Sequence, residues 1–265
     1  MALALGFDLI RKISTYLVAA PDASQQSPLL RLPGELRNQI YELALSDDEV
    51  LVQEEASGLF RLLRNMSPRK ELNQLKYTCR QLRHETRGLV PALNTLRFPD
   101  SGIEEQSVVA GRFLTACPQS TQTSIQKIVI EEHTTSLRAR PLYWKGVAPL
   151  CEFCREHPNM TIELSIDCAG SSPEMVRFIA MGNIISAALR KKPMDLQMVL
   201  VTAPLMGSLK SVWAGYAEDA EPVAENLRVI PRGTFTAHAT QFRPPRTPQG
   251  RLWLAQIEKW HKEGI

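Results

Sequence analysis

The sequence predicts a protein of the α+β or α/β class, with a helical module near the amino terminus and a small strand-helix-strand layer after it. The first observation is an apolar stripe at helical spacing just after Pro33, on one face of a predicted helix. Its members are Leu36, Ile40, Leu43 and Ala44. The second is a change of pattern after residue 98, where short apolar runs alternate with helical segments.

The composition is that of a globular protein. Of 265 residues, 44% are hydrophobic and 22% are charged, and the net charge of +3 is too small to identify a partner. Five cysteines, an odd number, argue against a disulfide framework and fit a reducing compartment. The amino terminus has the wrong charge order for a secretory signal, and the longest uncharged run is too short for a membrane helix. We therefore expect a soluble cytoplasmic or nuclear protein with no membrane partner.

The first predicted elements lie in residues 1–27. Residues 3–18 place apolar side chains near one face of a short helix, and the polar, turn-rich run over residues 21–28 is typical of a linker. A packing helix is the favoured interpretation of residues 3–18. A mitochondrial presequence is the alternative, but one basic pair and an acidic residue fit it poorly.

Two sequence strings carry a resemblance to a known family. Residues 30–45 read LRLPGELRNQIYELAL, and further along the chain CRQLRHE at residues 79–85 is followed by NTLRF at residues 94–98. Together they resemble a family of fungal F-box-like proteins. The resemblance implies a helical F-box-like module over residues 28–98 that binds a Skp-type adaptor of a cullin ubiquitin ligase. Its contacts would be Leu32, Pro33, Leu36, Ile40 and Tyr41.

The same apolar residues have a second interpretation, as the internal core of the module. Under the first interpretation the protein is a non-catalytic protein-interaction protein, in which the α/β part recruits an unknown protein substrate. Under the second, the F-box-like residues only hold the fold together.

A basic segment supports an alternative function. The spacing predicts a helix from about Glu71 to Val90 that Pro91 stops. Between Arg61 and Arg97 there are nine basic and two acidic residues, a net charge of +7. A nucleic-acid-binding face would use Lys76, Arg80, Arg83 and Arg87. A solvated face whose long side chains cover apolar surface explains the same pattern, and no nucleic-acid-binding signature accompanies it.

Residues 99–230 are predicted to form the α/β domain. Strands are expected at residues 125–130, 161–166, 196–201 and 226–230, with helices between them. This order favours parallel pairing through right-handed crossovers. An irregular arrangement similar to a leucine-rich repeat is the alternative that the spacing leaves open.

Residues 231–265 are predicted to hold a proline-rich extended segment and a carboxyl-terminal helix. Pro245 and Pro248, flanked by arginines, have the spacing of a ligand for an SH3-like domain, although a plain linker explains them as well. The closing helix carries Trp253 and Trp260, which we expect to dock on the body of the protein.

Two groups of residues in the sequence have a weak likeness to a metal site or a catalytic site. Cys151, Cys154 and His157 have a spacing that suits zinc, with Cys168 as a fourth ligand, but the cysteines already belong to an apolar stripe. Glu131-Glu132-His133 follows a predicted strand and is the nearest approach to an acid/base group. No nucleophile elbow, phosphate loop or dinucleotide motif is present. We predict no catalytic residue, no metal site and no cofactor.

Overall fold

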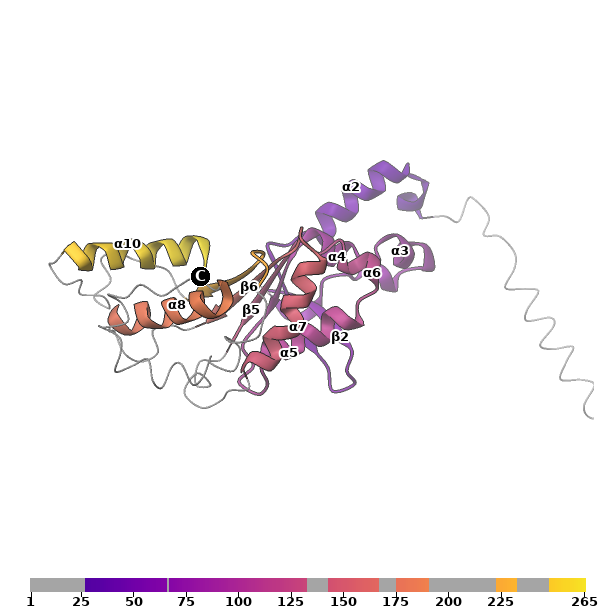
Figure 1. The fold of residues 1–265 in the computed structure, drawn as a ribbon. Helices are drawn as coiled ribbons and strands as arrows, with labels where there is room; N and C mark the ends of the chain where they lie inside the picture. The colour runs from indigo at the N-terminus through magenta and orange to yellow at the C-terminus, as the bar shows by residue number, and fades with distance from the viewer. Residues whose placement is uncertain (1–26, 66, 133–142, 167–174, 191–222, 233–247) are drawn as a thin grey trace, which may run out of the picture. The chain divides into compact units, whose positions relative to one another are not determined.

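A computed structural model describes residues 27–65, 67–132, 143–166, 175–190, 223–232 and 248–265 (Figure 1). The chain divides into two compact units, residues 1–44 and 45–265. Three predicted elements lie outside the described residues: the helix over residues 3–18, the strand at residues 196–201 and most of the proline-rich segment, Pro245 included.

The described part of the first unit consists of a 3-10 turn, η2 (Pro28–Arg31), and most of the predicted helix α2 (Gly34–Leu45). Pro33 lies just before α2, and its carbonyl accepts the amide of Arg37 at 3.1 Å. The Arg37 guanidinium then donates to the carbonyl of Leu32 at 2.6 Å. This side chain therefore ties the start of the helix to the chain that enters it.

The second unit is built on one open sheet of seven strands in the order β3-β2-β1-β4-β5-β6-β7. Strands β1, β4, β5, β6 and β7 are parallel, and β2 and β3 add an antiparallel hairpin beyond β1. The strands are β1 (Glu49–Glu54), β2 (Phe60–Arg64), β3 (Ser67–Glu71), β4 (Thr95–Phe98), β5 (Lys127–Glu131), β6 (Thr161–Ile166) and β7 (Leu227–Pro231). The predicted α/β class and the parallel pairing of its strands are confirmed.

The sheet buries one face and leaves the other partly open. Successive side chains of a strand point to opposite faces of the sheet, so residues that pair directly across neighbouring strands lie on the same face. Val50, Leu96, Ile128, Ile162 and Leu227 pair across the sheet and are all buried. The residues one position further along each strand lie on the opposite face and are half-buried or exposed. They are Leu51, Arg97, Val129, Glu163 and Arg228.

Helices cover the buried face. Helix α5 (Gln106–Ala116) contacts β4 and β5, α7 (Tyr143–Glu156) contacts β6 and β7, and the two helices pack against each other (Figure 1). Helix α10 (Pro248–Glu263) packs against α8 (Met175–Arg190) and β7. The predicted docking of the two tryptophans is confirmed, because Trp253 and Trp260 are 6% and 5% exposed.

The predicted continuous helix from Glu71 to Val90 is wrong. The chain forms a 3-10 turn η3 (Leu75–Tyr77), a short helix α3 (Arg80–Glu85) and a second short helix α4 (Leu89–Leu93). Cys79 is extended at the first break, and Gly88 has a φ of 80° at the second, a left-handed conformation that glycine adopts without strain. Pro91 lies inside the first turn of α4, where a missing amide is tolerated.

Residues 28–98 also contain strands β1 to β4, so the structure does not show a helical module over this range. Those four strands belong to the same sheet as the strands predicted for the α/β domain. In the part of the chain that the structure describes, no helix has the length and hydropathy needed to cross a membrane.

Candidate functional site

Helix α2 presents an apolar stripe to solvent. Leu36 is 44% exposed, Ile40 is 38% exposed and Leu43 is 84% exposed. The three side chains lie at i, i+4 and i+7, which places them along one side of the helix. Exposed apolar side chains that form a continuous stripe are typical of a contact surface.

The five residues predicted to bind the adaptor do not all share this stripe. Leu36, Ile40 and Pro33 are exposed, Leu32 is half-buried, and Tyr41 is fully buried. Tyr41 therefore fits the alternative interpretation as a core residue. Leu43, the most exposed of the stripe, was in the sequence pattern but not among the predicted contacts.

A basic cleft of about 600 Å³ lies in the second unit. Three arginines of the basic segment line it: Arg80 and Arg83 from α3, and Arg87 just after α3. Apolar side chains from distant elements also line it, among them Phe60 and Leu62 of β2, and Phe113 of α5. The cleft thus combines cationic and apolar groups.

Three other cations of the basic segment, Arg61, Lys76 and Arg97, form ion pairs with carboxylates. Lys76 forms an ion pair with the buried carboxylate of Glu71, which also accepts the Tyr77 hydroxyl at 2.6 Å. On the sheet, Arg97 pairs with Glu49 at 2.5 Å and with Glu131, and these carboxylates raise its pKa.

Arg80, Arg83 and Arg87 differ from those cations, because none of them forms an ion pair with any described residue. All three are exposed. Three like charges that share one cleft repel one another, and an anion in the cleft would relieve that repulsion.

A buried polar pair holds the corner that carries these arginines. The Asn73 amide donates to the hydroxyl of Thr86 at 3.1 Å, and the Asn73 side-chain oxygen accepts the amide of Lys76 at 3.2 Å. The Thr86 hydroxyl also donates to the carbonyl of Leu82 at 2.7 Å. Because Asn73 and Thr86 are both buried, these bonds fix η3 against the end of α3.

The cleft contains a thiol, but not a reactive one. Cys117 lines the cleft, and burial raises its pKa to about 11. A thiol with this pKa is almost wholly protonated at neutral pH, whereas the thiolate is the nucleophile. The cleft is therefore suited to binding a ligand, with no activated nucleophile at Cys117.

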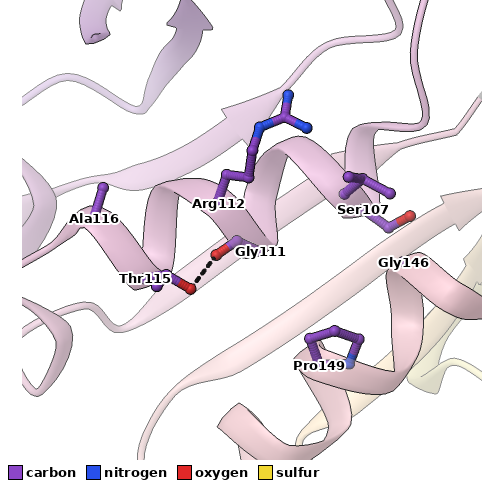
Figure 2. Close-up of a pocket in the computed structure, with 8 residues that line it drawn as sticks. Ser107, Gly111, Arg112, Thr115, Ala116, Gly146 and Pro149 are labelled. Carbon is purple, nitrogen blue, oxygen red and sulfur yellow. Dashed lines mark hydrogen bonds between the residues drawn. The ribbon is translucent and has the colours of Figure 1, made fainter. Parts of the chain in front are cut away.

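A second groove of about 460 Å³ runs between α5 and α7 (Figure 2). Small side chains dominate it, and Gly146 of α7 closely approaches Ser107 of α5. A Cβ atom at Gly146 would overlap the Ser107 hydroxyl. The absence of that Cβ lets the two helices approach each other, so Gly146 has a structural role at this contact.

The predicted acid/base group has a structural role. Glu132 is 2% exposed and accepts the backbone amides of Gln106 at 3.2 Å and Ser107 at 2.7 Å. Its carboxylate therefore satisfies free amides at the start of α5. Burial raises the pKa of Glu132, while Glu131 pairs with Arg97 and His133 lies outside the described residues.

The cysteine pair on α7 does not form a metal site with the described residues. Cys151 and Cys154 are buried, and burial raises the pKa of Cys154 to about 12, which disfavours the thiolate that zinc needs. The His157 ring stacks on Phe153 with a centroid distance of 4.1 Å. Among the described residues no three possible ligands come together, and Cys168 lies outside them.

Two surfaces of the described chain thus remain as candidates for binding: the α2 stripe of Leu36, Ile40 and Leu43, and the basic cleft around Arg80, Arg83 and Arg87. Each lies within a single unit. No protein-family model, curated protein or solved structure matches the chain.

Proposed function

We propose that the protein is a non-catalytic interaction protein whose α2 stripe docks a Skp-type adaptor of a cullin ubiquitin ligase. In this proposal helix α2 supplies the F-box-like contacts, and the α/β unit of residues 45–265 recruits a protein substrate. The observation that carries the proposal is the exposure of Leu36, Ile40 and Leu43 along one helix. The resemblance of residues 30–45 and 79–98 to fungal F-box-like proteins indicates the kind of partner.

The exposure of these three apolar side chains to water costs free energy that a partner could recover. Burying a leucine or isoleucine side chain fully is worth about 1.5–3 kcal/mol relative to leaving it in water. A partner that covered the α2 stripe would gain part of this free energy from each of three side chains. An amphipathic helix that docks through such spaced anchors is a common mode of protein recognition.

The test is co-purification of the full chain with a fungal Skp-type adaptor, followed by calorimetric titration. We expect stoichiometric binding with a Kd near micromolar or below, about −8 kcal/mol. The variant Leu36→Ala/Ile40→Ala should weaken binding at least about tenfold, while circular dichroism stays native because both side chains are exposed. Leu252→Ala is the matched control, since Leu252 is a 65% exposed leucine on α10.

Two results would count against the proposal. Absence of binding, or equal binding by the Leu36→Ala/Ile40→Ala variant, would remove adaptor docking through α2. Loss of the native spectrum in that variant would instead favour the interpretation of these residues as internal core.

A second candidate function is nucleic-acid binding at the basic cleft. It is supported by one observation: Arg80, Arg83 and Arg87 share a cleft and have no acidic partner among the described residues. Cations in such an arrangement are able to contact phosphates of a nucleic-acid backbone. Lys76 is a weaker candidate than the arginines because Glu71 already neutralises it.

Fluorescence anisotropy with labelled single-stranded and duplex oligonucleotides tests this second candidate. Affinity should fall steeply with salt and should be lost in the variant Arg83→Glu/Arg87→Glu. Lys76→Ala should change it less. Binding that is absent, or that does not respond to salt, would contradict nucleic-acid binding.

A further inference from the structure

We infer that the basic cleft binds a phosphate monoester carried on an apolar group, such as an aryl phosphate. The inference starts from the combination of groups in the cleft. Arg80, Arg83 and Arg87 supply the cationic part, and Phe60, Leu62 and Pro91 are among the apolar residues that line the same space. A ligand that satisfies both parts must itself have an anionic end and an apolar body.

The arginines favour phosphate as the anionic end. A guanidinium presents several N–H donors in a planar fork that matches a phosphate group, and such charge-assisted pairs are stronger than neutral hydrogen bonds. None of the three arginines is engaged by a carboxylate among the described residues, and the buried acid of the cleft, Glu71, is held by Lys76 and Tyr77. The positive charge of the three arginines is therefore available to a ligand.

The size of the cleft favours a compact ligand. Its volume of about 600 Å³ lies within the range of sites that bind small molecules or single side chains. Arg80 and Arg83 lie three positions apart on α3, and Arg87 follows just after that helix, so the three arginines come from one short segment. Because all three line one compact cleft, they suit a ligand with a single phosphate group.

Phe113, one of the two phenylalanines that line the cleft, gives no support to binding of a nucleic-acid strand. Single-stranded nucleic acid usually stacks its bases on exposed aromatic faces. Phe113 is 4% exposed, and edge contacts hold its ring against Phe60 at 5.3 Å and Phe98 at 5.6 Å between centroids. Phe113 thus adds apolar surface to the cleft without offering a ring face to a base.

The test is calorimetric titration of the full chain with four probes: inorganic phosphate, phenyl phosphate, a phosphotyrosyl peptide with its unphosphorylated form, and an oligothymidylate. We expect phenyl phosphate to bind at least about tenfold more tightly than inorganic phosphate, because its ring contacts the apolar lining. If the phosphotyrosyl peptide binds more tightly than phenyl phosphate, the natural source is a phosphorylated protein. If the two bind equally, the source is a small phosphate ester, and both outcomes support the inference.

The variants identify the site. Arg83→Gln/Arg87→Gln should weaken phenyl phosphate binding at least about tenfold, and Arg80→Gln should weaken it by a smaller factor. Arg251→Gln is the matched control, because Arg251 is an exposed arginine on α10 that does not line the cleft. All three cleft arginines are exposed, so these variants should keep the native circular dichroism spectrum.

Four results would overturn the inference: no binding of phenyl phosphate, equal affinity for inorganic and phenyl phosphate, unchanged binding by Arg83→Gln/Arg87→Gln, or binding of the oligothymidylate alone. The last would favour the nucleic-acid candidate. The inference is independent of the adaptor, since Leu36→Ala/Ile40→Ala alters α2 in the other unit and should leave ester binding unchanged. Failure of one proposal is therefore distinguishable from failure of the other.

Discussion

At the scale of single residues, buried polar groups decide how the second unit is held together. Asn73 and Thr86 bond to each other across the corner between η3 and α3, and Glu132 satisfies the first amides of α5. Each of these groups is at most 8% exposed, so each would be costly to leave without its partner.

The first prediction concerns the corner that carries the cleft arginines. Asn73→Ala should lower the free energy of unfolding by about 1–3 kcal/mol, because it leaves the buried Thr86 hydroxyl without one of its partners. Urea unfolding followed by circular dichroism measures the change. Gln81→Ala is the control: Gln81 is exposed and contacts Glu85 on the helix surface, so its loss should cost no more than about 0.5 kcal/mol. Equal effects of the two substitutions would contradict a special role for Asn73.

The second prediction concerns the pH dependence contributed by Glu132. Burial raises its pKa above the ordinary value of 4.5, so the folded protein holds this proton more tightly than the unfolded chain does. The stability that Glu132 contributes is therefore greatest below pH 4.5 and falls as pH rises through its folded pKa. Urea unfolding from pH 4.5 to 8, compared with Glu132→Gln, should show wild-type stability falling relative to the variant. A difference that does not change with pH would show that Glu132 has its ordinary pKa.

At the scale of elements, helices α5 and α7 meet through one close backbone contact. Gly146 approaches Ser107, whereas Gly111 on α5 faces the same groove with no atom near the position of a Cβ (Figure 2). The two glycines form a natural pair for a test of how closely the helices pack.

The third prediction compares these two glycines. Gly146→Ala should destabilise the protein by about 1–2 kcal/mol, because the overlap with Ser107 outweighs the gain in helix propensity. Gly111→Ala should be neutral or stabilising by up to about 1 kcal/mol, since it gains propensity without overlap. Thermal unfolding of the two variants measures both effects. If both substitutions stabilised the protein, the α5–α7 contact would be looser than the structure indicates.

The elements also show what the sequence could and could not predict. Strands β5, β6 and β7 were predicted because each has its own apolar run, and α10 was predicted from its apolar residues Leu252, Trp253, Ile257 and Trp260. The break at Gly88 was missed because Leu82 and Thr86 before it and Leu89 after it still follow a helical spacing. Helical periodicity therefore identified the buried Leu72, Leu82 and Thr86, but it missed the interruptions of the helix and the exposure of Cys79.

At the scale of the whole molecule, the core belongs to the second unit. Apart from Tyr41, every buried hydrophobic residue that the structure describes lies within residues 45–265. The basic cleft lies entirely within the same range. A unit with its own hydrophobic core is expected to fold independently.

The fourth prediction follows from this division. A fragment of residues 45–265 should keep a single cooperative thermal transition, a native near-ultraviolet spectrum and the binding of phenyl phosphate. The full chain is the control. A fragment with no near-ultraviolet signal would show that residues 1–44 are needed for the fold of the second unit.

The candidate sites were predictable to different degrees. The α2 stripe follows from local spacing, which needs no knowledge of the rest of the chain. The cluster of basic residues was also visible, but its shape was not, because Phe60, Phe113 and Thr121 reach the cleft from separate elements. The pairing of Lys76 with Glu71 depends on the 3-10 turn that replaces the expected helix. Such non-local contacts have no signal in a single sequence.

The order of the parallel strands has a consequence for synthesis. From β1 through β4, β5 and β6 to β7, each later strand lies beside the one before it, and the amide of Ile265 finally bonds to the Val229 carbonyl of β7. Because a ribosome releases the chain from its amino terminus, each emerging strand meets a sheet edge that has already left the exit tunnel. The second unit is therefore expected to assemble strand by strand during translation, and among the described strands β1 alone must wait for a partner, β4, that is made after its immediate successor.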